Sequence, residues 1–431
     1  MARSNLIKES IVDKNTYCVS PFNEVHINSW GKVRFCCQHF GIAENVNNTT
    51  LQDAFQAFEY KKARLDVLAG RWAKGCDMCI RDEESQKTST RIDNYDVFNN
   101  LDFPKDNFGK KIQKIGIVFS NSCNLRCTMC DPHKSTGWYK DAKVLEDTLG
   151  NDVRRAIQEG TPTGLGWDET SEFGLPLDFV DKNLETILNS AIIDCGGGEP
   201  FFMPRFTYLV DKLIENNYKG RLKIITNLTL LQDDMIKKLK KLHNVGIVVS
   251  TDGINDLYPY MRPSTPFGKY KGKTIQDKII KYQDVFNMNI SYTPQLMNVY
   301  NLKEYIEWLE ENIANSERFK NVAPKPSDKG FTYRNTNFSY NNFLNKSVTS
   351  PRYLRISVHP DTEYKNELAD WLEARDAKSF QSLIYQLRMP QSMDDINDWK
   401  FFCKTIDILD KHRKTSILKY IPELEKYWIK I

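Results

Sequence analysis

Short apolar runs rich in β-branched residues alternate with helical patterns from residue 114 onward. The apolar runs cover residues 114–120, 191–197, 222–227, 245–253, 289–297 and, as a sixth candidate, 354–359. Helical patterns, with apolar residues at three- and four-residue spacing, cover 204–217, 230–243 and 302–315. Near-continuous apolar strands separated by helices are typical of a parallel sheet covered on both faces. The alternation therefore predicts an α/β fold with about six strands, arranged as a full or partial barrel.

The chain before this alternation has a different character, with polar loops and one expected helix at 50–70. Thr50 is placed to cap the start of that helix and Gly70 to end it. The segment 91–111 is polar and turn-rich, which predicts a linker. The segment 321–347 is polar and rich in Asn, which predicts a loop, placed where it can lie over the mouth of the barrel.

These patterns predict three regions along the chain. A cysteine-rich region spans 1–100, the barrel spans 110–360, and a helical extension spans 361–431. The last region reads as amphipathic helices, and we expect Cys403 within it to be buried as a small apolar side chain.

Composition favours a soluble cytoplasmic protein. The stretch MARSNLIKES lacks the apolar core of a signal peptide, and no stretch approaches the ~18 apolar residues of a membrane span. In a reducing cytosol the ten cysteines would stay free, so clustered cysteines indicate metal or redox chemistry rather than disulfides. The 60 basic and 56 acidic side chains give a net charge of +4, which is too even to indicate a nucleic-acid partner.

Three cysteines crowd the turn after the first apolar run, in the stretch SNSCNLRCTMCDPH. Cys123, Cys127 and Cys130 have the spacing C-x3-C-x2-C, and His133 is the only nearby histidine. A structural zinc site wants four ligands, so zinc would need a remote fourth. A [4Fe-4S] cluster also has four corners, and three thiolates would leave one iron open to a small molecule.

At these residues the chain resembles the radical S-adenosylmethionine (radical SAM) enzymes. That family carries C-x3-C-x2-C after the first strand of a partial (β/α)6 barrel, so the resemblance implies a [4Fe-4S] cluster that binds S-adenosylmethionine (SAM). The residue before the last cysteine, usually aromatic in the family and near the adenine, is Met129 here. A thioether can still contact the ring.

The stretch CGGGEPFF closes the second strand run. Glycines there let the backbone approach a ligand, and a carboxylate beside them can accept from an ammonium group. Gly197, Gly198, Glu199 and Pro200 match the GGEP motif of the family in order. The resemblance implies that they lie beside the methionyl amino group of SAM.

The third strand run ends in Thr226 and Asn227, followed by Leu228. Radical SAM enzymes often have Thr-Asn-Gly at this place, so the glycine is missing here. The resemblance implies that both polar side chains face the barrel mouth.

The remaining candidates follow the second, fourth and fifth strand runs. Ser250 and Asp252 resemble the S-x-D-G segment of the family, which implies hydrogen bonds to ribose hydroxyls, and Arg262 would pair with the SAM carboxylate or a substrate anion. Asn298 is a polar residue at the same end of the barrel. Cys195 offers a thiol that can supply a hydrogen atom to a substrate radical; the alternative is a small buried side chain.

Five more cysteines precede the barrel. Cys18 and Cys36 bracket a C-x12-G-x4-C pattern, and Cys76 and Cys79 form a C-x2-C pair. Four thiolates would saturate a second [4Fe-4S] cluster, and a zinc site has equivalent spacing. The pattern resembles the SPASM and twitch auxiliary-cluster domains of radical SAM enzymes, although those usually follow the barrel. Cys37, beside Cys36, is a possible substitute ligand.

The resemblance implies reductive cleavage of SAM to methionine and a 5′-deoxyadenosyl radical, which abstracts hydrogen from a substrate. An external one-electron donor such as flavodoxin or ferredoxin would then be a partner. The substrate stays open between a peptide or protein side chain and a small metabolite or nucleotide. The alternatives are a non-catalytic iron-sulfur electron carrier and a zinc protein that binds nucleic acid.

Overall fold

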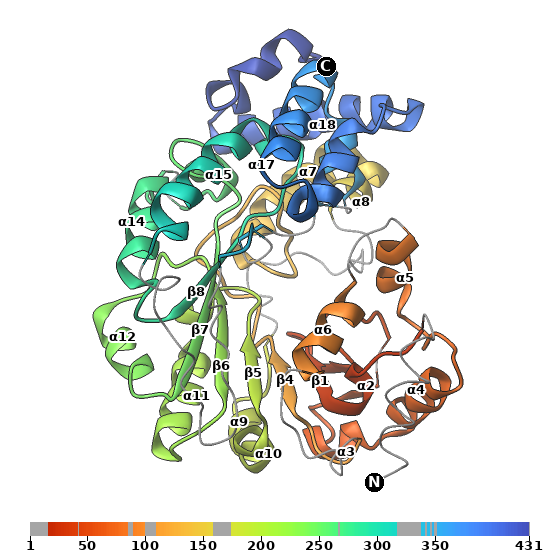
Figure 1. Cartoon of the computed structure of the whole chain (residues 1–431), viewed down its shortest axis with the longest axis vertical. Coiled ribbons are helices and arrows are strands. Elements are labelled where there is room, and N and C mark those ends of the chain that lie inside the picture. The colour runs from red at the N-terminus through yellow and green to blue at the C-terminus, as the bar shows by residue number, and fades with distance from the viewer. Residues whose placement is uncertain are drawn as a thin grey trace.

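The computed structural model describes most of the chain. The described residues are 16–41, 43–84, 89–99, 109–157, 174–265, 268–316, 338–340, 343–344, 347–348 and 351–430. Among them, one sheet has the strand order β3-β2-β1-β4-β5-β6-β7-β8 (Figure 1). Its strands are β1 (Glu24–Ile27), β2 (Lys32–Arg34), β3 (Glu44–Asn45), β4 (Lys114–Ile117), β5 (Ile192–Cys195), β6 (Arg221–Thr226), β7 (Asn244–Ser250) and β8 (Asn287–Ser291).

Helices lie around the sheet and in an extension beyond its upper end in Figure 1. Those of the N-terminal region are α2 (Ser20–Asn23), α3 (Leu51–Phe55), α4 (Phe58–Leu68), α5 (Asp77–Glu84) and α6 (Thr90–Asn99). Those between the strands are α7 (Tyr139–Leu149), α8 (Val153–Ala156), α9 (Phe179–Lys182), α10 (Leu184–Asn189), α11 (Pro204–Glu215), α12 (Asp233–Leu239), α13 (Tyr258–Met261) and α14 (Gly272–Tyr282). The last are α15 (Leu302–Leu309), α17 (Thr362–Arg388) and α18 (Met393–Arg413). None of these described helices is both long and apolar enough to cross a membrane.

The predicted α/β fold with a parallel sheet is confirmed. Strands β4 to β8 are parallel neighbours in chain order. The sixth parallel strand is β1 from the cysteine-rich region, which pairs with β4, while β2 and β3 continue the sheet antiparallel. The N-terminal region is thus continuous with the barrel sheet.

The strand predicted at 354–359 is wrong. The chain there makes two 3-10 turns, Arg352–Leu354 and Ile356–Val358. Their alternating apolar side chains are buried in the two core clusters of the protein. A short apolar alternation has the same appearance in a strand and in a packed irregular segment.

Two predictions for the N-terminal region need correction. The helix expected at 50–70 is two helices, α3 and α4, because Ala57 adopts an extended conformation between them. Thr50 does cap the first, since its side chain accepts from the backbone N–H of Asp53, and Gly70 follows the second with φ of 73°. The predicted linker 91–111 begins as helix α6, and its residues 100–108 lie outside the described part, as does most of the loop expected at 321–347.

The polar side chains of α6 explain that second error. Arg91 pairs with Glu83 (2.6 Å) and donates to the carbonyl of Tyr17 (2.9 Å). Asn94 donates to Glu24 (2.8 Å). These side chains make internal contacts, so their polarity did not indicate a solvated linker.

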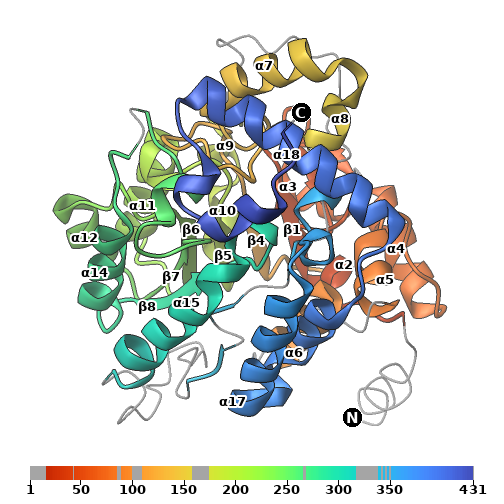
Figure 2. The same cartoon turned by 90° about the horizontal axis from the view of Figure 1, so that it is seen from above.

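The expected C-terminal helices are confirmed as α17 and α18, and Cys403 is fully buried. Helix α18 runs beside α7 and α8 in both views (Figure 2). A separate core cluster joins these elements and includes Trp138, Leu145, Met261, Phe402 and Leu409. The extension is thereby packed against the loop region at the end of β4.

The face of the sheet opposite the helix-covered core carries charged side chains. Lys114 Nζ lies 3.1 Å from Glu24 Oε1 and 3.6 Å from Asp194 Oδ2. His26 packs over Gly116, where an added Cβ would come within 2.4 Å of the imidazole ring. Branched aliphatic side chains usually fill the interior of a barrel. The charged side chains of this face offer polar contacts instead.

Candidate functional site

The three-cysteine loop follows β4 and is held by the segment after α13. Arg126 N donates to the carbonyl of Pro263 and Thr128 N to that of Met261, both at 2.9 Å. Inside the loop, Cys130 N donates to the carbonyl of Cys127 at 2.9 Å. These backbone hydrogen bonds hold the loop in place through the protein's own contacts.

The three thiols lie close enough to affect one another. Burial, then the neighbouring Cys127, raises the pKa of Cys123 to about 12, and burial with its neighbours also raises the pKa of Cys130. In the described part of the chain, no three His, Cys, Asp or Glu side chains are grouped so as to hold one metal ion. A [4Fe-4S] cluster takes each thiolate at a separate iron, so a loop presenting three neighbouring thiols fits that group.

Arg262 connects this loop with the end of β7. Its Nη1 donates to Cys127 Sγ at 3.5 Å, and its guanidinium forms an ion pair with Asp252. Asp252 also accepts from the backbone N–H of Thr293 (2.8 Å). Two residues predicted for the SAM site, Arg262 and Asp252, thus contact each other, and Arg262 also contacts a cysteine of the loop.

The GGEP turn contacts the loop at its other side. Gly197 and Gly198 have φ of 72° and 56°, which favours glycine. A Cβ at Gly198 would lie 2.4 Å from the carbonyl oxygen of Ser122. Glu199 N donates to that same oxygen (2.9 Å), and Pro200 begins the short 3-10 turn that follows.

The Glu199 carboxylate is fully buried and bonded within the protein. It accepts from the Thr226 hydroxyl (2.6 Å), from Asn227 N (2.7 Å) and from Phe201 N (3.1 Å). Burial raises the pKa of Glu199 to about 7, and these three donors act against the shift. Glu199 therefore links the ends of β5 and β6.

Leu228 stands where the family has the glycine of the Thr-Asn-Gly turn. Leu228 adopts φ of 62°, the left-handed conformation that glycine takes readily. Its N–H donates to the Thr226 hydroxyl (2.9 Å) and its side chain is fully buried. Burial of a leucine side chain, worth about 1.5–3 kcal/mol, offsets the strain of about 1–2 kcal/mol.

Asn124, between the first two cysteines, was not predicted as a site residue. Its amide accepts from Asn227 Nδ2 (3.0 Å) and donates to the Thr229 hydroxyl (2.9 Å). The loop is thus tied directly to the end of β6. The only available signal was its place inside the cysteine motif.

The other predicted residues differ in their surroundings. Asn298 is fully buried and donates to the carbonyls of Thr293 (2.9 Å) and Asp252 (3.0 Å). Ser250 ends β7, and Met129 packs at the edge of the core cluster that joins α18 to α7. Cys195 is fully buried in the main core, the surroundings of a small apolar side chain.

Sequence patterns also missed a buried contact from the C-terminal extension. Arg413 of α18 donates to the Thr128 hydroxyl (3.0 Å) and to the carbonyl of Arg126 (3.1 Å). It also pairs with Asp141 of α7. No signal linked these residues, because 272 positions separate Arg413 from Asp141.

The N-terminal cysteines gather around a hairpin. Gly31, the glycine of C-x12-G-x4-C, turns from β1 to β2 with φ of 75°. Burial raises the pKa of Cys18 to about 11 and that of Cys76 to about 12; Cys79 adds to the shift of both, and Cys18 adds to that of Cys76. Cys18 also acts on Cys36. The donor set fits a four-thiolate group.

Cys37 lies beside both Cys36 and the charged face of the sheet. Residue Cys37 is exposed, and Glu24, Lys114 and Lys223 act on its thiol. The Cys37 thiol in turn acts on that of Cys36. The two neighbouring cysteines differ in exposure, since Cys36 is buried.

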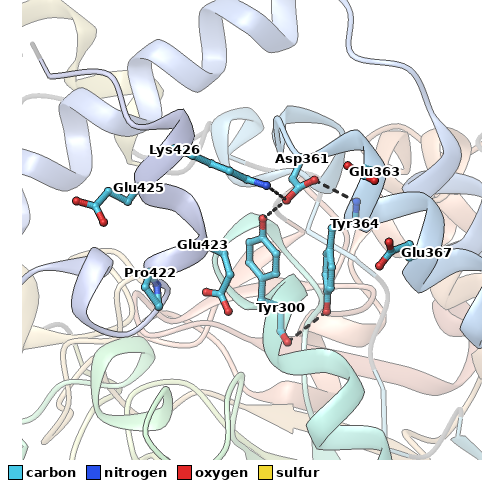
Figure 3. A pocket seen from close by; sticks show the side chains of 9 residues that line it. All are labelled: Tyr300, Asp361, Glu363, Tyr364, Glu367, Pro422, Glu423, Glu425 and Lys426. Atoms are coloured by element: carbon cyan, nitrogen blue, oxygen red, sulfur yellow. Dashed lines mark hydrogen bonds and ion pairs between the residues drawn. The ribbon is translucent and has the colours of Figure 1, made fainter.

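A groove of about 690 Å³ lies in the C-terminal extension (Figure 3). Asp361 at its centre accepts from the Tyr300 hydroxyl (2.6 Å) and from Tyr364 N (3.1 Å), and lies 3.4 Å from Lys426 Nζ. The groove is lined by none of the residues predicted for the site.

Comparison with known proteins identifies the domain. Residues 117–310 match the family model of the radical SAM superfamily, and no curated protein matches the chain. Similar solved structures include a histidine-tagged anSMEcpe with bound AdoMet, at 14% identity and a TM-score of 0.36 over 63% of this chain and 60% of that one. Another is Streptococcus suis SuiB bound to S-adenosylmethionine, at 14% identity and a TM-score of 0.33 over 78% and 54%.

The chain thus spans about 60% of the length of the first of these structures, and likeness at this level carries no inference about activity. The family match covers the three-cysteine loop, the GGEP turn and the ends of β6 to β8. Those are the elements that converge at one end of the sheet. Residues 117–310 of this chain thus match the radical SAM superfamily, whose cofactors are a [4Fe-4S] cluster and SAM.

Proposed function

We propose that this protein reductively cleaves SAM and uses the resulting 5′-deoxyadenosyl radical to abstract hydrogen from a substrate. The observation that carries the proposal is the junction of the three-cysteine loop with the GGEP turn and Arg262. Cys123, Cys127 and Cys130 would hold the cluster, which with SAM supplies the one-electron bond cleavage. A non-catalytic electron carrier would not need the strand-end residues that surround the loop.

The residues around the loop have a structural task in this proposal. Glu199 and Asn227 fix the strand ends against the loop, and Arg262 donates to Cys127 Sγ. Hydrogen bonds to ligand sulfurs tune the potential of iron-sulfur clusters. The same buried contacts keep the loop in one position, which radical chemistry needs so that reactive groups meet in the correct geometry.

The substrate class stays between a peptide or protein side chain and a small metabolite or nucleotide. The charged face of the sheet favours a polar substrate, because the interior of a barrel is usually filled with apolar side chains. An external one-electron donor such as flavodoxin or ferredoxin would be required.

Anaerobic reconstitution of the full chain tests the function. We expect roughly eight irons per chain and release of 5′-deoxyadenosine from SAM under a strong reductant. Iron below about four per chain together with stoichiometric zinc would refute both cluster assignments. Iron without any 5′-deoxyadenosine would instead favour the electron carrier.

We further propose that Cys18, Cys36, Cys76 and Cys79 hold an auxiliary [4Fe-4S] cluster. Changing Cys36 to Ala should reduce the iron content and deplete the second cluster, because one of four thiolates is lost. Changing Cys37 to Ala should leave iron near the wild-type content, because Cys36, which is buried, completes the C-x12-G-x4-C pattern and Cys37 lies outside it. Metal analysis and the optical spectrum measure both; equal iron loss in the two variants would contradict this assignment.

A further inference from the structure

We propose that Arg413, on the C-terminal helix α18, is a positioning residue of the three-cysteine loop, so that the C-terminal extension forms part of the cluster-binding site. The proposal rests on the proposed role of that loop as a cluster ligand. It assigns a function to an extension that lies beyond the residues matched by the family model.

The guanidinium of Arg413 contacts the loop on both sides of Cys127. Nη1 donates to the Thr128 hydroxyl (3.0 Å), and Nη2 donates to the carbonyl of Arg126 (3.1 Å). The guanidinium also lies 5.2 Å from the centre of the Trp138 ring, whose Nε1 donates to the carbonyl of Cys127 (2.7 Å). Three consecutive residues of the loop are therefore held from one side.

Asp141 of α7 orients the guanidinium. It accepts from Arg413 Nε (3.1 Å) and Nη2 (2.9 Å), a two-point contact that fixes the plane of the group. Asp141 is fully buried, and Arg413 is 6% exposed. Burying ions is costly unless they are well paired, and this two-point pair holds the Arg413 guanidinium against the loop.

Arg413 carries a positive charge close to the loop. Asp141 also lies 3.5 Å from Arg126 Nη1, and Asp410 is a second carboxylate that interacts with Arg413. A cluster held by three thiolates carries negative charge, and reduction adds another. A nearby positive charge stabilises the reduced form, so removing that of Arg413 should make the midpoint potential more negative.

Three full-length variants test the proposal. Arg413→Met should lose at least half of the iron of the loop's cluster after reconstitution, shift the midpoint potential of what remains to more negative values, and speed amide exchange at residues 123–130 of the apoprotein. Arg413→Lys keeps the charge without the two-point geometry, so it should restore the potential more fully than the exchange rates. These readouts separate the charge from a general loss of packing.

Arg155→Met is the matched control. Arg155 also fixes α18, through Asp398 (3.1 Å) and the ring of Phe401 (4.2 Å), and neither of these two contacts involves the loop. It should retain wild-type iron, potential and exchange. If Arg155→Met changed these as much as Arg413→Met, the effect would come from loosening α18 and the proposal would be overturned.

Another variant tests the proposal if Arg413→Met does not fold. Thr128→Val then removes the hydroxyl that accepts from Arg413 and donates to the carbonyl of Tyr260, and it should speed exchange of the loop and reduce its iron. Wild-type behaviour of Thr128→Val in that case, or of a folded Arg413→Met, would overturn the proposal. Failure of the proposed function has another signature: wild-type protein would lack iron, while the exchange measurements on apoprotein would still test the contact.

Discussion

Changing Cys123, Cys127 and Cys130 together to Ala is expected to abolish SAM cleavage and to remove about half of the iron, from roughly eight to roughly four per chain. The three thiols neighbour one another, and Cys127 accepts a hydrogen bond from Arg262. Without them the loop offers no thiolate to iron. Iron analysis and the yield of 5′-deoxyadenosine after anaerobic reconstitution measure the effect.

Cys403→Ala provides the control for this triple change. Cys403 is fully buried in α18, so its replacement tests the loss of a thiol with no proposed metal role. It should retain both the iron and the cleavage of SAM. Persistent 5′-deoxyadenosine release in the triple variant would contradict the proposed mechanism even if the iron content fell as expected.

Changing Glu199 to Ala is expected to lower the free energy of unfolding by at least about 3 kcal/mol and to reduce iron binding. Three donors, the Thr226 hydroxyl and the N–H groups of Asn227 and Phe201, would lose their acceptor. Each unsatisfied buried group costs about 1–3 kcal/mol. Denaturant unfolding of the apoprotein measures the stability separately from the cofactors.

Two further variants sharpen this test. Glu215→Ala removes a carboxylate whose side chain is 59% exposed and paired with Lys212, so its cost should stay below about 1 kcal/mol. Glu199→Gln keeps one acceptor oxygen and should fall between the two. If Glu199→Ala lowered the free energy of unfolding no more than Glu215→Ala does, the three hydrogen bonds would not be what stabilises the contact between these strand ends.

Strand β7 could be predicted because its run NVGIVVS is nearly continuously apolar, as expected of a parallel strand that is covered on both faces. Strand β1 was missed, since Glu24 and His26 alternate with Val25 and Ile27 and belong to the charged face of the sheet. A short alternating run does not state which strand it will join.

The candidate site also has one part that could be predicted from the sequence and one part that could not. The cysteine loop and the GGEP turn could be located because close spacing along the chain encodes them. The partners of Asp252 and Glu199 could not, because they depend on how different strand ends meet. Arg413 left no local signal, since its contacts with the loop join residues 285 and 287 positions apart.

The pairing of β1 with β4 also affects how the protein can be handled. Removing the N-terminal region to isolate the barrel would leave β4 at the edge of the sheet, with a row of unpaired N–H and C=O groups. It would also strip Lys114 of its contacts with Glu24 and Asn94. A barrel without that region would therefore present a new edge for intermolecular strand pairing, and aggregation during expression would be the expected result.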